Sequence, residues 1–422
     1  MHILFLSDNY PPEVNAPASR TFEHCREWVR AGHSVTVITC VPNFPKGEVY
    51  EGYRNRPWQQ ETQEGIRVIR VWSYVTANAG FGKRILDYQS FMVTATLAAA
   101  FIRQVDVVVG TSPQFFTVCA AYVVSRLKRI PFVFELRDLW PESIKAVGAM
   151  QDSVWLARLE RLELFLYRKA TKIISVTRSF RQNLIGRGID GAKISVVTNG
   201  VDTTRFRPHA RDTQLIAELG LRGAFVAGYI GTHGLAHNLE TLLEAARRLR
   251  EYPQGQAIRI LFLGDGANKA KLIEQARTMA LDNVVFIDSV PKDDVVRYWS
   301  LLDVSIIHLK KAGLFTSVIP SKLFECMGMG IPVLHGVAGE SAEIVERERC
   351  GQVFEPENVD QLVAGLLALQ AAPDLCQQYR KNGVAAAGRY DRREQALKML
   401  QALADAATGE SRGAREIPQS GS

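Results

Sequence analysis

Three segments in the second half of the chain place a tight turn between a strand end and a helix start. They are YIGTHGLAHNLETLLEAA, where Asn238 can cap the helix, FLGDGANKAKL, and VIPSKLFECMGMGIPVL, where Pro320 and Ser321 open the helix. A helix N-terminus presents unpaired N–H groups and a partial positive charge, which suits a phosphate. Lys322 adds a full positive charge beside the third turn. Together the turns predict a site for a nucleotide diphosphate.

One helical turn after Lys322, Glu325 can face the same site. A carboxylate there can accept hydrogen bonds from both hydroxyls of a ribose, as acidic residues do in dinucleotide sites. Each feature alone has a plainer interpretation: a glycine lets the chain bend, Ser321 caps a helix, and Glu325 is a solvated helix residue. The joint occurrence of three turns in one domain favours the binding site. The residues predicted to line it are Gly231, Thr232, His233, Gly264, Asp265, Gly266, Val290, Ser321, Lys322, Leu323 and Glu325.

Two common nucleotide-binding motifs do not occur. The sequence contains no GxxxxGK[ST], and no GxGxxG follows its first strand. Their absence argues against a kinase-like P-loop and against a dehydrogenase.

In the first half, the segment PFVFELRDLWPES ends a buried strand in charged residues. Glu135, Arg137 and Asp138 come at the strand end, followed by Trp140 and Pro141. Charges at the carboxyl end of a parallel strand point toward the ligand side of such a sheet. We therefore predict that Asp138 orients a reacting hydroxyl or sugar and that Arg137 holds an anionic group. The alternative is a structural ion pair between these two residues.

The loop after the first strand, SDNYPPEVNAPASRTFEH, is stiffened by two prolines and leads into a helix that contains Arg20. Glu13, Asn15 and Arg20 are our candidates for contacting a second substrate. The alternative is a surface loop that precedes a capped helix.

Short β-branched runs alternate with longer amphipathic stretches through both halves, which predicts parallel sheets covered by helices. We expect two doubly wound, Rossmann-like α/β domains that face each other across a cleft. The predicted boundaries are 1–205 for the first domain, 206–222 for a linker, 223–390 for the second domain, 391–408 for a helix that crosses back to the first domain, and 409–422 for a disordered tail.

Composition narrows the class of protein. The 422 residues carry a formal charge of +7; residues 1–205 hold 26 Lys and Arg against 18 Asp and Glu, and residues 206–422 hold 25 against 26. The basic half indicates an anionic partner. No RNA- or DNA-binding motif is present, so we expect a membrane surface rather than nucleic acid, unless the face is simply solvated. The six scattered cysteines indicate reduced thiols, and no CxxC suggests a metal site.

The start of the chain, MHILFLSD, has no basic region before its apolar run and is not expected to be a signal peptide. The longest apolar stretch, Phe91 to Ile102, is too short to span a bilayer. We expect a cytoplasmic protein. With Lys83 and Arg84, the apolar stretch can rest on the inner face of a membrane, or it can be a helix buried in the first core.

Several of these residues resemble a known family. NGVD at Asn199 to Asp202, GDG at Gly264 to Gly266, and the helix-opening segment that ends in Glu325 resemble the retaining GT-B glycosyltransferases of family 4, over about residues 1–408. RDLWPES, PSKLFE and HNLETLLEAA resemble a bacterial subgroup of N-acetyl-L-fucosamine-type transferases in O-antigen and capsule assembly.

This resemblance implies that a UDP-sugar binds the second domain and an undecaprenyl-diphosphate-linked saccharide binds the first. It also implies anomeric retention without a metal or another cofactor. The chain departs from the family pattern at several positions. Ser317 replaces a glutamate of the family, and Thr232 and His237 replace an arginine and a lysine of the family. Arg137 stands in place of a histidine. Diphosphate neutralisation must then depend on Lys322, on helix N-termini, or on the histidines.

Two other functions stay open at the level of sequence. One is a non-hydrolysing UDP-sugar 2-epimerase, in which Asp138 and His233 would serve as acid and base, although the motif order fits this class poorly. The other is a non-catalytic scaffold that binds a nucleotide sugar, which the departures from the family pattern make conceivable.

Overall fold

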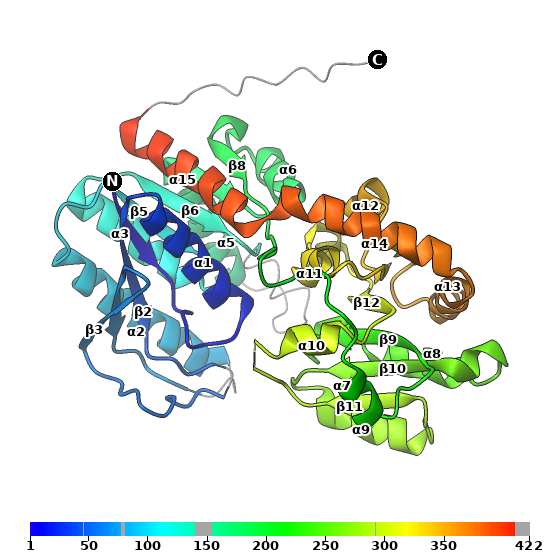
Figure 1. The fold of residues 1–422 in the computed structure, drawn as a ribbon. Coiled ribbons are helices and arrows are strands. Elements are labelled where there is room, and N and C mark those ends of the chain that lie inside the picture. The colour runs from blue at the N-terminus through cyan, green and yellow to red at the C-terminus, as the bar shows by residue number, and fades with distance from the viewer. Residues whose placement is uncertain (45, 77–80, 140–153, 292, 410–422) are drawn as a thin grey trace, which may run out of the picture. The chain divides into compact units, whose positions relative to one another are not determined.

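The computed structural model describes residues 1–44, 46–76, 81–139, 154–291 and 293–409. The chain folds into two compact units (Figure 1). Unit 1 comprises Met1–Thr198 together with the C-terminal residues from Arg393, and unit 2 comprises Asn199–Arg392. Each unit is an α/β layered structure around a parallel sheet, as the sequence predicts.

The sheet of unit 1 has the strand order β3-β4-β2-β1-β5-β6-β7-β8. Its neighbours are parallel except for the antiparallel pair β3 and β4. Near-continuous apolar runs form the central strands, which are buried on both faces. The strands are β1 His2–Leu6, β2 Ser34–Cys40, β3 Trp58–Gln63, β4 Ile66–Val71, β5 Val107–Thr111, β6 Phe132–Leu136, β7 Lys172–Ser175 and β8 Ile194–Val196.

The last helix of the chain, α15 (Arg392–Thr408), packs on unit 1. The indole Nε1 of Trp28 donates a hydrogen bond to the carbonyl of Ala396 at 2.8 Å, and Met399 and Leu403 lie buried in the same core. The predicted return of this helix to the first domain is therefore confirmed. The other described helices of unit 1 are α1 Ala16–Arg30, α2 Phe81–Ala100, α3 Phe115–Lys128, α5 Val154–Lys169, α6 Arg178–Gly186 and the 3-10 turn η1 Gly191–Lys193.

The sheet of unit 2 is wholly parallel, with the strand order β11-β10-β9-β12-β13-β14. The strand order reverses direction next to β9, because the chain moves outward to β10 and β11 and then returns to β12. In open α/β sheets, ligands bind at the carboxyl ends of strands at such a switch point. The strands are β9 Phe225–Ile230, β10 Ile258–Leu263, β11 Val284–Ile287, β12 Val304–His308, β13 Val333–Gly336 and β14 Gly351–Val353.

Helices and 3-10 turns connect these strands. The α-helices of unit 2 are α7 Thr213–Glu218, α8 Glu240–Leu249, α9 Lys269–Thr278, α10 Val295–Trp299, α11 Lys322–Met329, α12 Glu340–Glu348, α13 Val359–Ala371 and α14 Pro373–Ala387. The 3-10 turns are η2 Leu235–His237, η3 Gln254–Ala257, η4 Gly313–Ser317 and η5 Gly388–Tyr390.

The domain boundaries differ from those predicted. Residues 199–205 belong to unit 2 rather than to the first domain, and the predicted linker 206–222 forms part of the same unit. Phe206, Leu215 and Leu221 of this segment are buried in the core of unit 2. Their apolar side chains outweigh the arginines and the proline that suggested a linker. Of the predicted disordered tail, residues 410–422 lie outside the described residues.

Candidate functional site

The first two predicted turns are joined to each other by backbone hydrogen bonds. The N–H of Gly231, just after β9, donates to the carbonyl of Leu263 at 2.9 Å, and the N–H of His233 donates to the carbonyl of Asp265 at 2.8 Å. The carbonyl of His233 in turn accepts from the N–H of Asn268 at 2.9 Å. The loops that follow β9 and β10 therefore form one continuous surface at the carboxyl edge of the sheet.

Two glycines make this close approach possible. Gly264 and Gly266 have φ angles of +144° and +154°, which side-chain-bearing residues rarely adopt. A Cβ atom on Gly264 would lie 1.9 Å from the carbonyl oxygen of Gly231, and one on Gly266 would lie 2.6 Å from that of His233. Only glycine fits at either position.

The third predicted turn contributes Lys322, the first residue of α11, to the same place. A Cβ atom on Gly231 would lie 2.8 Å from the Nζ of Lys322. That Nζ lies 3.7 Å from the ring centroid of Tyr229 and, among the described residues, has no hydrogen-bond acceptor. Burial lowers the pKa of Lys322 to about 8. The ammonium is thus held at the Gly231 turn without a hydrogen bond to any carboxylate of the described residues.

Two histidines beside this lysine also lack hydrogen-bond partners in the part of the chain described. Both ring nitrogens of His233, which is fully buried, and the Nδ1 of His237 are unsatisfied. Burial, reinforced by nearby lysines, lowers the pKa of His233 to about 4 and that of His237 to about 3. Both imidazoles are therefore neutral near pH 7, and each can donate one hydrogen bond from a ring N–H.

An unsatisfied buried polar group costs about 1–3 kcal/mol. Here four such nitrogen atoms gather at the end of β9, on Lys322, His233 and His237. A ligand with several acceptor oxygens and negative charge could accept a hydrogen bond from the ammonium and from one ring N–H of each imidazole. We call this set, with the loop Gly231–Gly234, the nitrogen cluster.

The start of α11 completes this arrangement. Ser321 precedes the helix, and its side chain makes no capping hydrogen bond to the helix. Glu325 lies one turn beyond Lys322, with its carboxylate 3.8 Å from the Nη2 of Arg392. Leu323 is fully buried in the core of unit 2, so its side chain supports the helix rather than facing a ligand. Ser317 lies in η4, where its hydroxyl donates to the carbonyl of Leu314.

The remaining predicted residues of this site have mainly supporting contacts. The carbonyl of Thr232 accepts a hydrogen bond from the Tyr229 hydroxyl at 2.8 Å. Asp265 accepts from the N–H of Gly266 at 2.8 Å. Val290, in the loop after β11, packs partly buried against the core. The structure therefore brings the three turns together and gives Val290 a packing role.

In unit 1, the charged strand end of β6 is held by a buried ion pair and by a shared hydroxyl group, and the predicted substrate roles of Arg137 and Asp138 stay predictions. Arg20 and Glu135 form a buried ion pair at 2.9 Å. The backbone N–H groups of Arg137 and Asp138 instead share the hydroxyl of Ser112, at 2.8 and 3.3 Å. Burial lowers the pKa of Arg137 to about 10, and its buried Nη1 has no hydrogen-bond partner among the described residues. Trp140 and Pro141 lie outside the described residues.

The three residues predicted to contact a second substrate have structural roles. Arg20 also donates to the carbonyls of Val197 and Thr198, so it ties α1 to the far side of the sheet. Asn15 caps α1 by accepting from the N–H of Ala18 at 2.8 Å. Glu13 accepts from two backbone N–H groups of the loop after β2, and burial raises its pKa to about 7. These residues hold the loops of unit 1 in place.

Three residues that matter to these sites were not predicted from the sequence. Asp8 follows β1, and burial raises its pKa, opposed in part by Arg137. Tyr229 lies under the ammonium of Lys322, and Arg392 faces Glu325. Asp8 could have been predicted in the same way as Asp138, because both are charged residues that follow a buried strand. Tyr229 and Arg392 carry no such signal.

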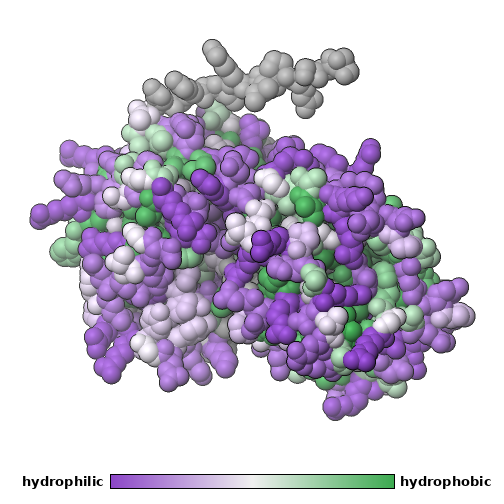
Figure 2. Space-filling view, in the orientation of Figure 1, coloured by the Kyte–Doolittle hydropathy of each residue, from purple (hydrophilic) through white to green (hydrophobic). Residues whose placement is uncertain are grey.

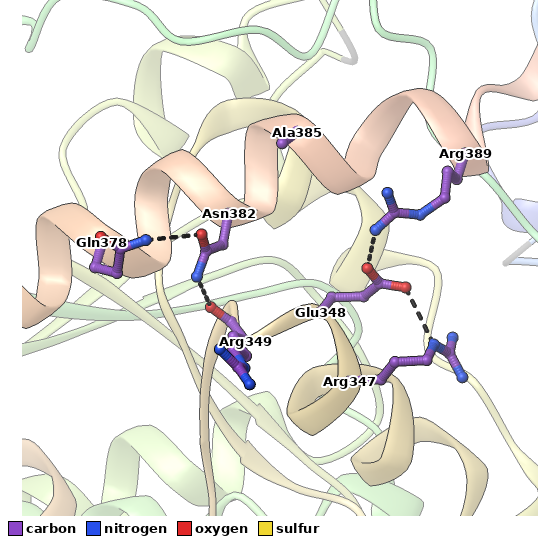
Figure 3. Close-up of a pocket in the computed structure, with 7 residues that line it drawn as sticks. All are labelled: Arg347, Glu348, Arg349, Gln378, Asn382, Ala385 and Arg389. Carbon is purple, nitrogen blue, oxygen red and sulfur yellow. Dashed lines mark hydrogen bonds and ion pairs between the residues drawn. The ribbon is translucent and has the colours of Figure 1, made fainter. Parts of the chain in front are cut away.

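A separate hollow of about 380 Å³ lies between α12 and α14 of unit 2 (Figure 3). Three arginines line it, Arg347, Arg349 and Arg389. Figure 3 shows Glu348 between Arg347 and Arg389, with which it forms ion pairs. Their charge is thereby partly neutralised within the protein, and none of the predicted site residues lines this hollow.

Comparisons with known proteins agree with the division into two units. Residues 15–200 match the family model described as "Glycosyl transferase 4-like domain", and residues 213–385 match "Glycosyl transferases group 1". Two bacterial relatives align over most of their length. The putative colanic acid biosynthesis glycosyl transferase WcaI of Escherichia coli (strain K12) is 28% identical over 87% of this chain and 91% of its own. A GDP-mannose-dependent alpha-mannosyltransferase of Mycobacterium tuberculosis is 23% identical over 83% of each chain.

Among solved structures, HepE of Anabaena in complex with UDP and glucose superposes with a TM-score of 0.71. It has 16% sequence identity over 95% of this chain and 99% of its own, which shows a shared fold. The two family matches fall in order on unit 1 and unit 2, and both units are parallel-sheet α/β domains. The chain is therefore built from the two domains of a glycosyltransferase with the GT-B fold.

Proposed function

We propose that this protein transfers a sugar from a UDP-sugar to a lipid-linked saccharide during bacterial surface polysaccharide assembly, with retention of anomeric configuration. The observation that carries the proposal is the nitrogen cluster: a buried ammonium and two neutral imidazoles, with four nitrogen atoms that have no hydrogen-bond partner among the described residues, at the switch point of the unit 2 sheet. A diphosphate supplies both the charge and the acceptor oxygens that this cluster lacks.

The surrounding residues suit the rest of a nucleotide. The turns at Gly231 and Gly264 allow the backbone to approach a phosphate closely, and helix α11 begins at Lys322, beside Gly231. Glu325, one turn along α11 and 3.8 Å from the Nη2 of Arg392, is proposed to accept hydrogen bonds from the ribose hydroxyls. This assignment follows the one made from the sequence, in which Lys322 and the two histidines neutralise the diphosphate.

The nitrogen cluster also suggests how the reaction is driven. When the bond between the sugar and the diphosphate breaks, negative charge accumulates on the leaving diphosphate. Lys322 and the imidazole N–H groups are fixed in place beforehand, so they can stabilise that charge without reorganising, which is a large contribution in enzymes of this kind. We propose that these groups neutralise the diphosphate without a metal. In a retaining reaction, the donor phosphate would accept the proton of the attacking hydroxyl.

We propose a UDP-sugar as the donor. UDP is supported by the resemblance of the sequence motifs and by the UDP in the HepE complex, whereas one relative is named for GDP-mannose. The motif resemblance also favours an N-acetylated amino or deoxy sugar. The base lies beyond the nitrogen cluster, which recognises only the part common to both nucleotides.

The acceptor is proposed from the bacterial polysaccharide context of the relatives and from the basic character of unit 1. WcaI is named for colanic acid biosynthesis, and residues 1–205 carry a formal balance of +8. We propose an undecaprenyl-diphosphate-linked saccharide as acceptor, bound to unit 1 near Arg137 and Asp138 at the inner face of the cytoplasmic membrane. The guanidinium of Arg137, whose Nη1 lacks a partner among described residues, suits the anionic part of such a molecule.

A direct test incubates the purified protein with bacterial membranes and a panel of UDP- and GDP-sugars, and measures nucleotide release and sugar incorporation into lipid. Acceptor-dependent UDP release from one UDP-sugar is expected. Conversion of UDP-GlcNAc to its 2-epimer without acceptor would instead identify an epimerase. UDP binding with no turnover on any acceptor would identify a scaffold.

A further inference from the structure

A buried histidine at the end of β12 joins two loops that lie far apart in the sequence. His308 is the last residue of that strand and is 1% exposed. Hydrophilic residues dominate the face of the molecule drawn in Figure 2, so a polar side chain at the surface needs no special explanation. A buried imidazole does need one, because its ring nitrogens cost free energy unless they have hydrogen-bond partners.

Both ring nitrogens of His308 have backbone partners. The Nδ1 lies 2.7 Å from the carbonyl oxygen of His237, in the turn η2, and the Nε2 lies 2.9 Å from the backbone nitrogen of Glu357, in the loop between β14 and α13. A backbone N–H can only donate, so Nε2 is the acceptor and the ring proton is on Nδ1. Burial lowers the pKa of His308, which favours this neutral form. One tautomer therefore satisfies both loops.

A second hydrogen bond joins the same two loops. The Nδ2 of Asn238 donates to the Oε1 of Glu357 at 2.7 Å. Both residues have left-handed backbone conformations, with φ angles of +42° and +68°. Such conformations are uncommon for residues other than glycine, and they persist where surrounding contacts fix them. His237 and Asn238 are thus held by contacts with His308 and Glu357.

The main chain after β12 fixes the turn on its other side. The N–H of Lys310 donates to the carbonyl of Ala236 at 2.9 Å. Within the turn, the N–H of His237 donates to the carbonyl of Gly234 at 3.0 Å. The backbone on each side of His237 is therefore fixed by contacts from β12 and from the loop before α13.

The imidazole of His237, a member of the nitrogen cluster, depends on this backbone for its position. Its Nδ1 is buried without a hydrogen-bond partner among the described residues, so this atom does not hold the ring in place. The ring contacts that of Tyr229 edge to face, with centroids 5.9 Å apart, and such a contact gives no directional bond. Hydrogen bonds weaken steeply when donor and acceptor are misaligned. A shift of the His237 backbone would therefore weaken any bond from this ring to a ligand.

We propose that His308 is a positioning residue: by donating its Nδ1–H to the carbonyl of His237, it holds the His237 imidazole where that ring can donate a hydrogen bond to the diphosphate. The inference rests on the proposed function, because it assumes a diphosphate at the nitrogen cluster. Glu357 contributes by fixing the tautomer, since its N–H occupies Nε2 and leaves the ring proton directed at His237. A histidine that merely fills the core would affect stability and not ligand binding.

The first test is calorimetric titration of the full chain with UDP. His308→Leu removes both hydrogen bonds of the ring and should weaken UDP binding about tenfold, because a hydrogen bond to an anion is lost or misaligned. His308→Asn places an amide N–H near the position of Nδ1, so it should bind UDP within about threefold of the natural protein.

His335→Leu is the matched control. His335 is fully buried on the neighbouring strand β13, and its Nε2 is hydrogen-bonded to the hydroxyl of Ser341 at 2.8 Å rather than to the turn. This variant also loses a buried hydrogen bond, but it should leave UDP affinity unchanged. A loss of UDP affinity as large as that of His308→Leu would overturn the proposal.

The combination with His237→Ala separates positioning from a general loss of stability. In that background, His308→Leu should cause no further loss of UDP affinity, because the ring that it positions is absent. Losses that simply add would overturn the proposal, since His308 would then act on UDP binding independently of His237.

Nitrogen NMR of the ligand-free protein, labelled at histidine, tests the contact without any nucleotide. His308 should carry its ring proton on Nδ1, and the ring signals of His237 should shift in His308→Leu and stay in place in His308→Asn. A proton on Nε2 of His308, or His237 signals that ignore both substitutions, would overturn the positioning role. A natural protein that shows the expected signals but binds no UDP would contradict only the proposed function.

Discussion

The ammonium of Lys322 lies 3.7 Å from the ring centre of Tyr229, and no described acceptor is bonded to it. A cation over an aromatic face gains about 0.5–2 kcal/mol, less than the several kcal/mol that burying an ion costs. The ligand-free protein therefore carries a destabilising charge in unit 2. Such a charge is expected where the ligand brings the compensating anion.

The first prediction concerns Lys322→Met, which replaces the ammonium by a neutral group of similar length. The variant should bind UDP about 10- to 150-fold more weakly, since a charge-assisted hydrogen bond contributes about 1.5–3 kcal/mol. Without ligand it should unfold at the same or a higher temperature, because a buried unpaired charge is removed. Calorimetric titration and thermal unfolding measure the two effects. Lys271→Met, which removes an exposed lysine paired with Glu240, serves as control and should leave UDP affinity unchanged.

The second prediction is a pH dependence. Burial lowers the pKa of Lys322 to about 8 from an ordinary 10.5, so the ligand-free protein loses this proton as the pH rises through 8. A bound diphosphate favours the charged form, so UDP affinity should be greatest below pH 8 and fall between pH 8 and 9.5. His233 and His237 are already neutral in this pH range, so they do not contribute to the change of UDP affinity with pH. A Lys322→Met variant with the same slope would show that another group titrates.

The same shift has a consequence for stability with a defined sign. Between pH 8 and 10.5 the unfolded chain binds a proton at Lys322 that the folded chain does not, so the contribution of this residue to the free energy of unfolding increases with pH in that window. Its destabilising effect is fully present below pH 8. Comparing the natural protein with Lys322→Met by urea unfolding at pH 7.5 and 9.5 isolates this contribution: the difference between the two proteins should shrink at the higher pH.

The third prediction tests the close approach of the two loops. Gly264→Ala introduces a Cβ atom 1.9 Å from the carbonyl oxygen of Gly231 at a φ of +144°, which should destabilise unit 2 by about 2–4 kcal/mol and weaken UDP binding. Gly388→Ala is the matched control, because a Cβ there meets nothing within 4 Å and the backbone is helical. Thermal unfolding of the two variants should differ by several degrees. Equal unfolding temperatures would mean that the loops separate without cost.

The fourth prediction assigns the ribose. Glu325→Ala should weaken UDP binding by about 1.5–3 kcal/mol, the contribution of hydrogen bonds to a charged group. The natural protein should prefer UDP over 2′-deoxy-UDP, whereas the variant should distinguish them poorly. If the preference survived in Glu325→Ala, the carboxylate would be serving mainly as the partner of Arg392.

The fifth prediction separates the two units. Asp138→Asn should abolish transfer while UDP affinity stays within about twofold, because Asp138 belongs to unit 1 and the nitrogen cluster to unit 2. Sugar incorporation and calorimetric UDP binding are measured on the same preparation. Full activity of the variant would remove Asp138 from the proposed acceptor side.

Much of the fold could be predicted from local patterns. Near-continuous apolar runs such as HILFL and IRILFL specify buried parallel strands, and the alternation with amphipathic stretches specifies the layers. The segment 206–222 was predicted wrongly as a linker. A polar segment with a few apolar residues has the same sequence pattern whether it connects two domains or packs on one of them. Phe206, Leu215 and Leu221 are buried in the core of unit 2 by residues that are distant in the sequence, and the sequence pattern does not reveal these contacts.

The candidate site divides in the same way. Gly231, Gly264 and Lys322 could be predicted because turn glycines and helix starts leave a signal in sequence. The ion pair of Arg20 could not be predicted, because its partner Glu135 lies 115 residues away in the sequence. The lack of hydrogen-bond partners at His233 and His237 can be recognised only from the three-dimensional positions of the surrounding residues.

The path of the chain has a consequence for how the protein is made. Unit 2 is continuous from Asn199 to Arg392, whereas the hydrophobic core of unit 1 includes Ala396, Met399 and Leu403 from α15. Unit 1 cannot complete its core until the last helix has left the ribosome. The half that is translated first is therefore expected to finish folding last, and a fragment that stops at residue 198 should expose the surface around Trp28 and aggregate.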